Sequence, residues 1–387
     1  MAEASHHACP VTSGTLMWDH GATQGRRTQR SPILKGEPRV DVVIDFEVSN
    51  RCNARCHFCP RDQTPHQGNM PQEVFDQAIV RAKEYREIAR ELLGGKTSIS
   101  LCGLGEPLLN RNIIEYVRTA KAEGFRVQMS SNGSLLTEEK GRALLDAGLD
   151  EILINAGDEG DDYEEVYGLP WQKTYDNIVR FKQMADEAGT CTVNIVLVNH
   201  RRSPEHSTKM RALWKQHDIK HFYEFDVMNR GGALFVDHMQ YEEKPQLRQA
   251  QELIAAQGVV PRCGAPFAYL FIGYDAEYYL CCSDWRKETS MGSIFDVSFL
   301  DITADKIRMV TSRQPACLTC NVDPINQLTG DLEAVELGQA HPSLIDATLA
   351  SVVGASQFVE NEIEALGFGE AAASAKPARR LIPVRAD

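Results

Sequence analysis

The feature that most constrains the fold is an alternation of β-rich and amphipathic segments between residues 40 and 257. Amphipathic stretches typical of helices separate the β-rich runs, and a sixth helix is predicted over 242–258. Strands and helices that alternate in this way predict a parallel sheet with helices on its outside. We therefore expect an α/β fold with its functional site at the carboxyl ends of the strands. The apolar runs, nearly continuous as in a buried parallel sheet, cover 40–49, 97–103, 125–131, 150–156, 191–199 and 221–228.

The pattern changes after residue 257. Two alternating runs, 267–274 and 276–282, flank a turn at Asp275 and Ala276 and predict a β-hairpin. A short helix is predicted over 307–314 and a further helix over 344–366, whereas the start of the chain lacks apolar periodicity. The predicted division is a disordered tail (1–38), an α/β domain (39–257), a hairpin-and-helix domain (258–330) and a C-terminal helix with a mobile tail (331–387).

Composition and charge exclude several classes of function. The 387 residues are 43% hydrophobic and 25% charged, as in ordinary globular proteins. A formal charge of −13 argues against nucleic acid or an anionic membrane as partner. There is no apolar run of the roughly 20 residues that a membrane helix needs, and the N-terminus does not resemble a secretory signal. We expect a cytoplasmic protein.

Cysteine usage is the most informative part of the composition. The chain has 11 cysteines, and in a reducing cytosol that number indicates metal or cluster binding rather than disulfides. Three of them lie between positions 52 and 59, and five lie between 263 and 320. The sequence therefore predicts two separate cysteine sites.

The first site is the segment FEVSNRCNARCHFCP, directly after the first predicted strand. It places Cys52, Cys56 and Cys59 in a C-x3-C-x2-C pattern. A [4Fe–4S] cluster normally takes four thiolates, so three would leave one iron open to another ligand. Structural zinc is the alternative, but it usually takes four ligands from two separated pairs. His57 lies between the cysteines, where it cannot easily fold back, so the spacing favours a cluster over zinc.

A C-x3-C-x-aromatic-C pattern after the first strand of a β/α repeat resembles the radical S-adenosylmethionine (SAM) superfamily. In that family the three cysteines hold a [4Fe–4S] cluster, and SAM binds the open iron through its amino and carboxylate groups. Cys52, Cys56 and Cys59 match those ligands, and Phe58 matches the aromatic residue. The resemblance implies a partial (β/α)6 TIM-like barrel with a small auxiliary-cluster domain after it.

Further matches to the family follow the next three predicted strands. After the second strand comes a counterpart of the Gly-Gly-Glu-Pro motif that holds the SAM amino group: Gly103, Gly105, Glu106 and Pro107. After the third strand, Ser131 and Asn132 belong to a segment similar to the family's (S/T)-N-G turn. The fourth strand departs from the family's Ser-x-Asp pattern and reads INAGD. The resemblance therefore suggests Asn155 and Asp158 as the contacts to the SAM ribose.

The second site resembles the SPASM/twitch extension of radical SAM enzymes. The implied ligands are Cys263, Cys317, Cys320 and one of Cys281 and Cys282. Alignment with the family's D-G-x-x-x-x-C pattern selects Cys281, and adjacent strand residues point to opposite faces, so Cys282 faces away. The number of cysteines favours the shorter twitch form with one auxiliary [4Fe–4S] cluster. Zinc would also suit four cysteines that end in C-x2-C, and only the pairing with a radical SAM barrel favours the cluster.

The resemblance also implies a reaction. One electron from the first cluster cleaves SAM to methionine and a 5′-deoxyadenosyl radical, which takes a hydrogen atom from substrate. The auxiliary cluster favours a two-electron oxidation of a small natural product, sugar or aminocyclitol, with flavodoxin or ferredoxin as reducing partner. A peptide maturase that forms thioethers or other crosslinks, a radical epimerase and a non-catalytic zinc or iron–sulfur protein remain alternatives. Only a short polar tail precedes the barrel, where peptide-modifying relatives often carry a leader-reading domain, and this favours a small molecule.

Three residues are candidates for proton or hydrogen transfer. Asp226, near the end of the sixth predicted strand, and Asp284, just after the cysteine pair, are acids that could remove a proton. Cys282 could face substrate and would return the hydrogen atom in an epimerase. A solvated or capping carboxylate and a packed thiol are the alternative roles.

The first prediction follows from the separation of the two cysteine sites. Replacing Cys52, Cys56 and Cys59 together with Ala should abolish SAM cleavage, because the iron that binds SAM is lost, while the second cluster is retained. An iron assay and a deoxyadenosine assay with a strong chemical reductant measure the two effects. Formation of 5′-deoxyadenosine by the triple variant would contradict the assignment.

Overall fold

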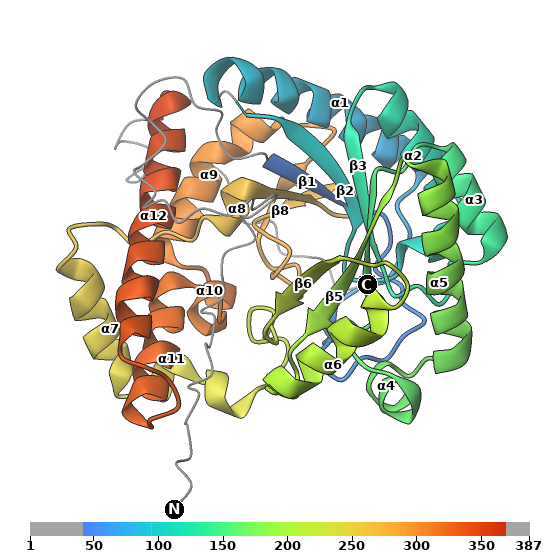
Figure 1. The fold of residues 1–387 in the computed structure, drawn as a ribbon. Coiled ribbons are helices and arrows are strands. Elements are labelled where there is room, and N and C mark those ends of the chain that lie inside the picture. Colours follow the sequence, from blue (N-terminus) through green and yellow to red (C-terminus); the bar gives the residue numbers. More distant parts are fainter. Residues whose placement is uncertain (1–41, 94, 369–387) are drawn as a thin grey trace, which may run out of the picture.

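The computed structural model describes residues 42–93 and 95–368, so the predicted tail over 1–38 lies outside the described residues. Its main feature is a nine-stranded sheet with the strand order β6-β5-β4-β3-β2-β1-β7-β8-β9 (Figure 1). The strands are β1 (Val42–Glu47), β2 (Thr97–Cys102), β3 (Arg126–Ser131), β4 (Glu151–Asn155), β5 (Thr192–Val198), β6 (His221–Phe225), β7 (Tyr269–Ile272), β8 (Glu277–Tyr279) and β9 (Ser290–Ser293). Strands β1 to β6 are parallel and lie within the predicted ranges, which confirms the α/β fold.

Helices follow the strands of the parallel part and cover its outside (Figure 1). Those of the barrel are α1 (Gln72–Ile88), α2 (Ile113–Ala122), α3 (Glu138–Asp146), α4 (Gly160–Tyr167), α5 (Trp171–Ala188) and α6 (Pro204–Lys215). The later helices are α7 (Gln246–Ala255), α8 (Ala265–Ala268), α9 (Phe299–Ser312), α10 (Pro315–Thr319), α11 (Pro324–Glu336) and α12 (Ser343–Ala365).

Strand β1 has one apolar and one polar face. On β1, Ile44 and Phe46 belong to the main core, where Phe46 meets Phe75 of α1 edge-to-face at 5.7 Å. Asp45 and Glu47 alternate with them and are also buried. The expectation of nearly continuous apolar strands is therefore wrong in detail. On β1 the helix-covered face is apolar and the opposite face carries polar side chains. On β6, by contrast, Glu224 faces α6 and accepts hydrogen bonds from Ser207 and Arg211.

The C-terminal hairpin continues the sheet of the barrel. Strand β7 pairs in parallel with β1, with Ile44 opposite Leu270, and β8 and β9 follow as antiparallel strands. A buried ion pair joins the same two parts: Lys287 Nζ lies 2.6 Å from Glu47 Oε2 and 3.0 Å from Asp275 Oδ2. The hairpin is thus fixed beside the carboxyl end of β1, where the first cysteine segment begins.

The sixth predicted helix packs differently from the expectation. We expected it on the outside of the sheet, but α7 packs against α11 and α12, and these three helices lie side by side at one edge of the molecule (Figure 1). Ala250 and Ile254 of α7 form a separate core with Leu328 of α11 and Val352 of α12. The apolar stripe of α7 was recognised correctly, but its partner was not, because that partner lies more than 70 residues later in the chain.

Some elements have no counterpart in the sequence prediction. They include helix α4, strand β9 and helix α11, while α9 begins at Phe299 rather than at residue 307. Ser298 and Asp301 form a reciprocal capping box that starts α9 eight residues before the predicted helix. The predicted helix over 344–366 is confirmed by α12.

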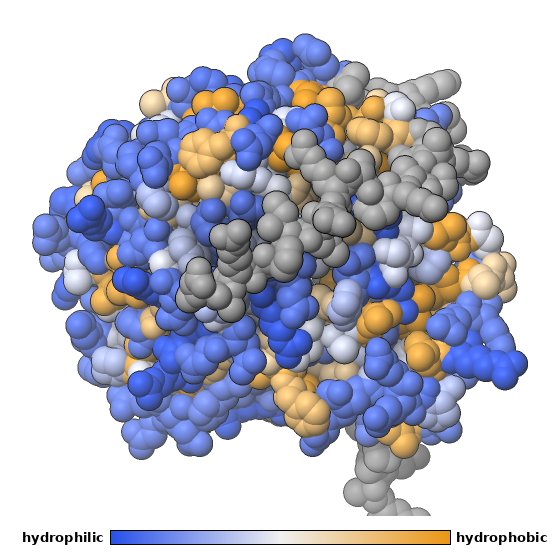
Figure 2. Space-filling view, turned by 180° about the vertical axis from the view of Figure 1, so that it is seen from behind, coloured by the Kyte–Doolittle hydropathy of each residue, from blue (hydrophilic) through white to orange (hydrophobic). Residues whose placement is uncertain are grey.

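One face of the molecule is mostly hydrophilic, with small separate apolar patches (Figure 2). Among the described residues, no helix combines the length and hydrophobicity that a membrane span requires.

Candidate functional site

The cysteines of the first site, Cys52, Cys56 and Cys59, lie in an irregular segment that leaves β1 and folds back toward the end of that strand. Ser49 pairs with Asn69 in an isolated antiparallel bridge, and the Ser49 hydroxyl donates to Asn69 Oδ1 at 2.8 Å. Asn50 Nδ2 donates to the His66 carbonyl at 2.6 Å, and Asn50 Oδ1 accepts from the Gly68 amide at 2.7 Å. We call residues 48–70 the cysteine loop. Its two ends are fixed side by side without help from a helix or strand.

The three thiols of the cysteine loop are partly buried and close to one another. Burial raises the pKa of Cys52 to about 11. Burial also raises the pKa of Cys56, and the charges of Cys59 and Cys52 raise it further. Arg61 Nη1 donates to the carbonyls of Cys52 (3.2 Å) and Ala54 (2.9 Å), which orients the chain around the first thiol. Thiolates in such a place need a positive partner, which an iron cluster supplies.

The segment after β2 packs against the cysteine loop, backbone to backbone. The Glu106 amide donates to the Arg51 carbonyl at 2.8 Å. A Cβ on Gly105 would lie 2.6 Å from the carbonyl carbon of Asn50 and closer still to the Arg51 oxygen, so only glycine permits this approach. Gly103 has φ +135°, a conformation that L side chains rarely adopt. The backbone geometry therefore explains why both positions of the motif are glycine.

The carboxylate of Glu106 connects the ends of β2 and β3. It is buried and accepts hydrogen bonds from the Leu108 amide (3.0 Å), the Ser131 hydroxyl (2.9 Å) and the Asn132 amide (2.7 Å). Burial raises its pKa, and these donors lower it. In the structure Glu106 is thus a positioning residue, and Pro107 begins a short 3-10 turn, Pro107–Leu109, directly after it. A direct contact of Glu106 with the SAM amino group stays a prediction.

The turn after β3 contacts the cysteine loop directly. Asn132 Nδ2 donates to Asn53 Oδ1 at 3.0 Å and lies 3.9 Å from Cys52 Sγ. Asn53 Nδ2 in turn donates to the Ser134 hydroxyl at 2.9 Å. The segments after β1, β2 and β3 therefore meet at one place, as the order of the three motifs suggests.

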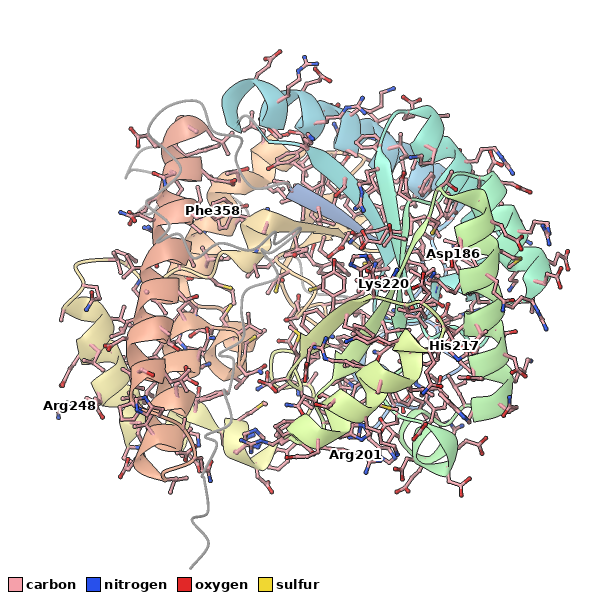
Figure 3. The ribbon with its side chains drawn as sticks, in the orientation of Figure 1. Asp186, Arg201, His217, Lys220, Arg248 and Phe358 are labelled. Atoms are coloured by element: carbon pink, nitrogen blue, oxygen red, sulfur yellow. The ribbon has the colours of Figure 1, made fainter. Side chains whose placement is uncertain are left out.

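The two residues suggested after β4 differ in how accessible they are. Asp158 is fully buried and accepts from His200 Nε2 (2.7 Å) and Arg201 Nε (2.9 Å); Arg201 lies close to α6 in Figure 3. Burial would raise the pKa of Asp158, but these hydrogen bonds outweigh it and the pKa is lowered. Asn155 is half-buried, and its Oδ1 accepts from the Tyr167 hydroxyl at 3.2 Å. Asn155 is therefore the better placed of the two for a ligand.

The aromatic residue of the cysteine motif extends the site toward β5. The ring of Phe58 lies 5.5 Å from that of Tyr167, at a steep angle, and 5.6 Å from that of His200. The sequence analysis missed His200 and Arg201. The feature of the sequence that could have identified them is the basic segment His-Arg-Arg directly after the fifth apolar run.

The second cysteine set gathers four thiols around the start of α8, the end of β8 and helix α10. Burial raises the pKa of Cys281 well above its usual value, and the charges of Cys282, Cys320, Cys317 and Cys263 raise it further. The charges of Cys320 and Cys317 likewise raise the pKa of Cys263. Cys320 is buried and the others are partly buried. The residues proposed as four ligands are therefore neighbours in space.

Cys282 has different surroundings from Cys281. Its pKa is raised to about 11, mainly by burial and next by the Asp45 carboxylate, while the Arg230 guanidinium opposes the increase and Cys320 adds a smaller one. It packs against the apolar cluster of Leu104, Phe271, Tyr279 and Trp285. The two adjacent cysteines thus have different neighbours, as expected for the end of a strand.

The two candidate acids of the sequence analysis lie in contrasting places. Asp284 is buried and accepts from the amides of Glu288 (3.0 Å) and Thr289 (2.8 Å) and from the Thr289 hydroxyl (2.6 Å). These donors belong to its own turn, so the carboxylate shapes the segment after β8. Asp226 is exposed and accepts from Asn199 Nδ2 at 3.1 Å. A catalytic role for either stays a prediction.

A third acid, Asp45, lies on the polar face of β1 and was missed in the sequence analysis. It is buried, Cys102 Sγ donates to its Oδ1 at 3.3 Å, and its pKa is raised to about 6 by burial. The feature of the sequence that could have identified it is an aspartate inside the largely apolar run VVIDFE. Ionisable groups with shifted pKa values next to thiols are candidates for a site.

The donor chemistry fits two iron–sulfur clusters. Within residues 42–93 and 95–368, no three His, Cys, Asp or Glu side chains are close enough to hold a single metal ion. In a cubane each thiolate binds a different iron, so its cysteines lie further apart than the ligands of one ion. Three sulfur donors in the cysteine loop and four in the second set match an open and a closed cluster.

Comparison with known proteins agrees with this arrangement. Residues 46–202 match the radical SAM superfamily, and residues 263–321 match the SPASM domain, an iron–sulfur cluster-binding domain. The chain contains a radical SAM domain followed by a SPASM domain. These two domains imply a SAM-binding [4Fe–4S] cluster and an auxiliary iron–sulfur cluster, for which Cys52, Cys56 and Cys59 and the second cysteine set are the candidate ligands. The twitch form with a single auxiliary cluster stays a prediction from the cysteine count.

Curated relatives match parts of this radical SAM protein. A cofactor-modifying protein of the tungsten-containing aldehyde ferredoxin oxidoreductase of Pyrococcus furiosus is 30% identical over 111 residues, 28% of this chain and 29% of the relative. A probable GTP 3′,8-cyclase of Saccharolobus solfataricus is 27% identical over 226 residues, 57% of this chain and 66% of the relative. The chain thus spans less than two thirds of the first relative's length and about two thirds of the second's.

Solved structures with a similar course of the chain include BtrN in complex with AdoMet and 2-DOIA. It has a TM-score of 0.45 and 17% identity, over 74% of this chain and 94% of BtrN. Streptococcus suis SuiB bound to the precursor peptide SuiA has a TM-score of 0.49 and 14% identity, over 73% of this chain and 70% of SuiB. For anSMEcpe with bound AdoMet the values are 0.47 and 14%, over 75% of this chain and 84% of anSMEcpe.

The second prediction tests the contact that only glycine permits. Gly105→Ala should lose first-cluster iron and SAM cleavage, because the added Cβ pushes the segment after β2 away from the cysteine loop. Gly354→Ala, in α12, is the control, since its Cβ meets nothing within 4 Å. Iron content and 5′-deoxyadenosine formation are measured for both variants. A Gly105→Ala protein with full iron and normal SAM cleavage would refute this account.

The third prediction concerns the adjacent cysteines. Cys281→Ala should lose the auxiliary cluster, because Cys281 lies among the other three candidate ligands, whereas Cys282→Ala should retain it. Iron content and the absorption spectrum of the anaerobically purified variants provide the measurement. Loss of auxiliary iron in Cys282→Ala together with retention in Cys281→Ala would reverse the assignment.

Proposed function

We propose that this protein is a radical SAM oxidoreductase that dehydrogenates a small alcohol substrate, such as a sugar or aminocyclitol. The observation that carries the proposal is the closeness of the two cysteine sets. Cys59 of the cysteine loop and Cys282 beside the second set pack against the same apolar cluster of Leu104, Phe271, Tyr279 and Trp285. A substrate held at this cluster would be near both iron–sulfur sites.

The side chain of Arg230 also supports a shared site. Burial raises the pKa of Cys59 and of Cys282, and the Arg230 guanidinium opposes the increase at both thiols. The guanidinium carbon lies 5.2 Å from the ring centroid of Trp285. A cation between the two cysteine sets can orient a polar substrate and compensate the negative charge of the thiolates.

When bound, the first cluster and SAM supply a radical that removes a hydrogen atom from a carbon, and the auxiliary cluster supplies an electron acceptor. The second hydrogen of an alcohol leaves as a proton and needs an acceptor. Asp45 is suited to this, because it is buried beside Cys102 and its pKa is raised to about 6. Asp45 is therefore our first candidate for the base, ahead of Asp226 and Asp284.

The fourth prediction tests whether the reaction is an oxidation. After the substrate has been identified, the product should be two mass units lighter, with one 5′-deoxyadenosine formed per product. The same loss of mass within a peptide would indicate a crosslinking maturase instead. An unchanged mass with one solvent deuterium on carbon would contradict oxidation and indicate an epimerase, with Cys282 as the first candidate for the hydrogen donor.

The pH dependence of product formation tests which residue is the base. Product formation should fall as the pH drops through about 6, because protonation of Asp45 removes the acceptor. Asp45→Asn should lower product formation by about 100-fold or more and lose that acid limb, while SAM cleavage and iron content stay normal. Asp226→Asn and Asp284→Asn are the matched comparisons. If one of them, and not Asp45→Asn, removes the acid limb, that residue is the base.

A further inference from the structure

A buried lysine lies beside the second cysteine set. Lys306 of α9 is 4% exposed, and its Nζ donates to the Pro266 carbonyl at 2.9 Å. The same Nζ lies 5.4 Å from the ring centroid of Phe267. Pro266 and Phe267 follow the candidate ligand Cys263 by three and four residues. An ammonium group in such a place is costly unless negative charge lies nearby.

The surroundings of Lys306 connect it to the second cysteine set. Phe267, Leu280 and Ile307 share one small apolar core, and Cys317 packs against that core. Leu280 immediately precedes Cys281, and Ile307 immediately follows Lys306. Burial lowers the pKa of Lys306 to about 7, while the charges of Glu362 and Cys281 act in the opposite direction. A cluster at this site would add further negative charge and favour the charged lysine.

On its other side Lys306 faces the buried acid Glu362 of α12. Lys306 and Glu362 line one small internal cavity together with Tyr85 and Thr303. Glu362 is 3% exposed. Phe358, labelled on α12 in Figure 3, lies one helical turn before Glu362 and packs against the same core as Ile307. Lys306 is thus a buried amine whose charged form is favoured by the nearby charges of Cys281 and Glu362.

We propose that Lys306 raises the reduction potential of the auxiliary cluster by placing a buried positive charge beside it. A cluster that gains one electron becomes more negative, and a nearby cation stabilises that reduced state more than the oxidised state. Lys306 is a positioning residue in this role, since it acts on the cluster and does not contact substrate. The proposal depends on the auxiliary cluster alone and not on the substrate chemistry proposed above.

The test is a redox titration of the auxiliary cluster in the full chain. The background carries Ala at Cys52, Cys56 and Cys59, so that one cluster is observed by electron paramagnetic resonance. Lys306→Met should shift the midpoint potential to more negative values, and Lys306→Arg should restore it. Glu362→Gln should shift the potential in the opposite direction, because it removes a negative charge. Lys220→Met is the control, since Lys220 is exposed and in Figure 3 lies by β6, not by α9 or α12.

Opposite shifts in the two buried variants distinguish a charge effect from structural damage, which would not follow the sign of the charge. An unchanged potential in Lys306→Met with full iron content would overturn the proposal, and so would a lowered potential that Lys306→Arg does not restore. If Lys306→Met fails to assemble the cluster, Glu362→Gln decides: a higher potential supports the proposal and an unchanged one overturns it. None of these results depends on whether the enzyme dehydrogenates its substrate.

Discussion

A backbone contact between two irregular segments holds the first site together. The Glu106 amide binds the Arg51 carbonyl at 2.8 Å, and only the absence of a side chain on Gly105 allows this approach. The Glu106 carboxylate then fixes Ser131 and the Asn132 amide, and the Asn132 side chain returns to the cysteine loop. The chain thus forms a closed circuit of hydrogen bonds through the ends of β1, β2 and β3. Three thiols on a loop without regular secondary structure are positioned by this circuit.

The second constraint is the buried ion pair at the junction of the barrel and the hairpin. Lys287 reaches Glu47 at 2.6 Å and Asp275 at 3.0 Å, and burial raises the pKa of Glu47 while Lys287 opposes the increase. Buried pairs contribute little net stability because both charges lose their hydration. Breaking one is costly, however, so the pair is suited to fixing how the two parts are oriented. With the pairing of β1 and β7, it helps to hold Cys59 of the cysteine loop and Cys282, the neighbour of Cys281, against one apolar cluster.

The local parts of this architecture could be predicted from the sequence, whereas the long-range contacts could not. The cysteine motif and the glycine segment depend on neighbours along the chain, so their spacing identified them. Asp158 was expected to meet a ligand, but its partners His200 and Arg201 lie more than 40 residues away and already occupy the carboxylate. The partner of α7 is similarly distant, because an apolar stripe shows that a helix is buried but not against what. Asp45 was overlooked because the run was read as continuously apolar, although Asp45 and Glu47 are two residues apart and therefore share one face of the strand.

Net charge is a poor guide to the electrostatics of these sites. The chain carries −13 overall, yet cations lie at both cysteine sets. Arg61 and Arg230 oppose the effect of burial on the pKa of Cys59, and Lys306 lies buried near Cys281. Thiolates in a low-dielectric interior repel one another, so a site that gathers three or four of them needs nearby positive charge. Iron supplies most of that charge when a cluster is bound. The arginines then offset part of the remaining thiolate charge, and in our proposal the buried lysine makes the auxiliary cluster easier to reduce.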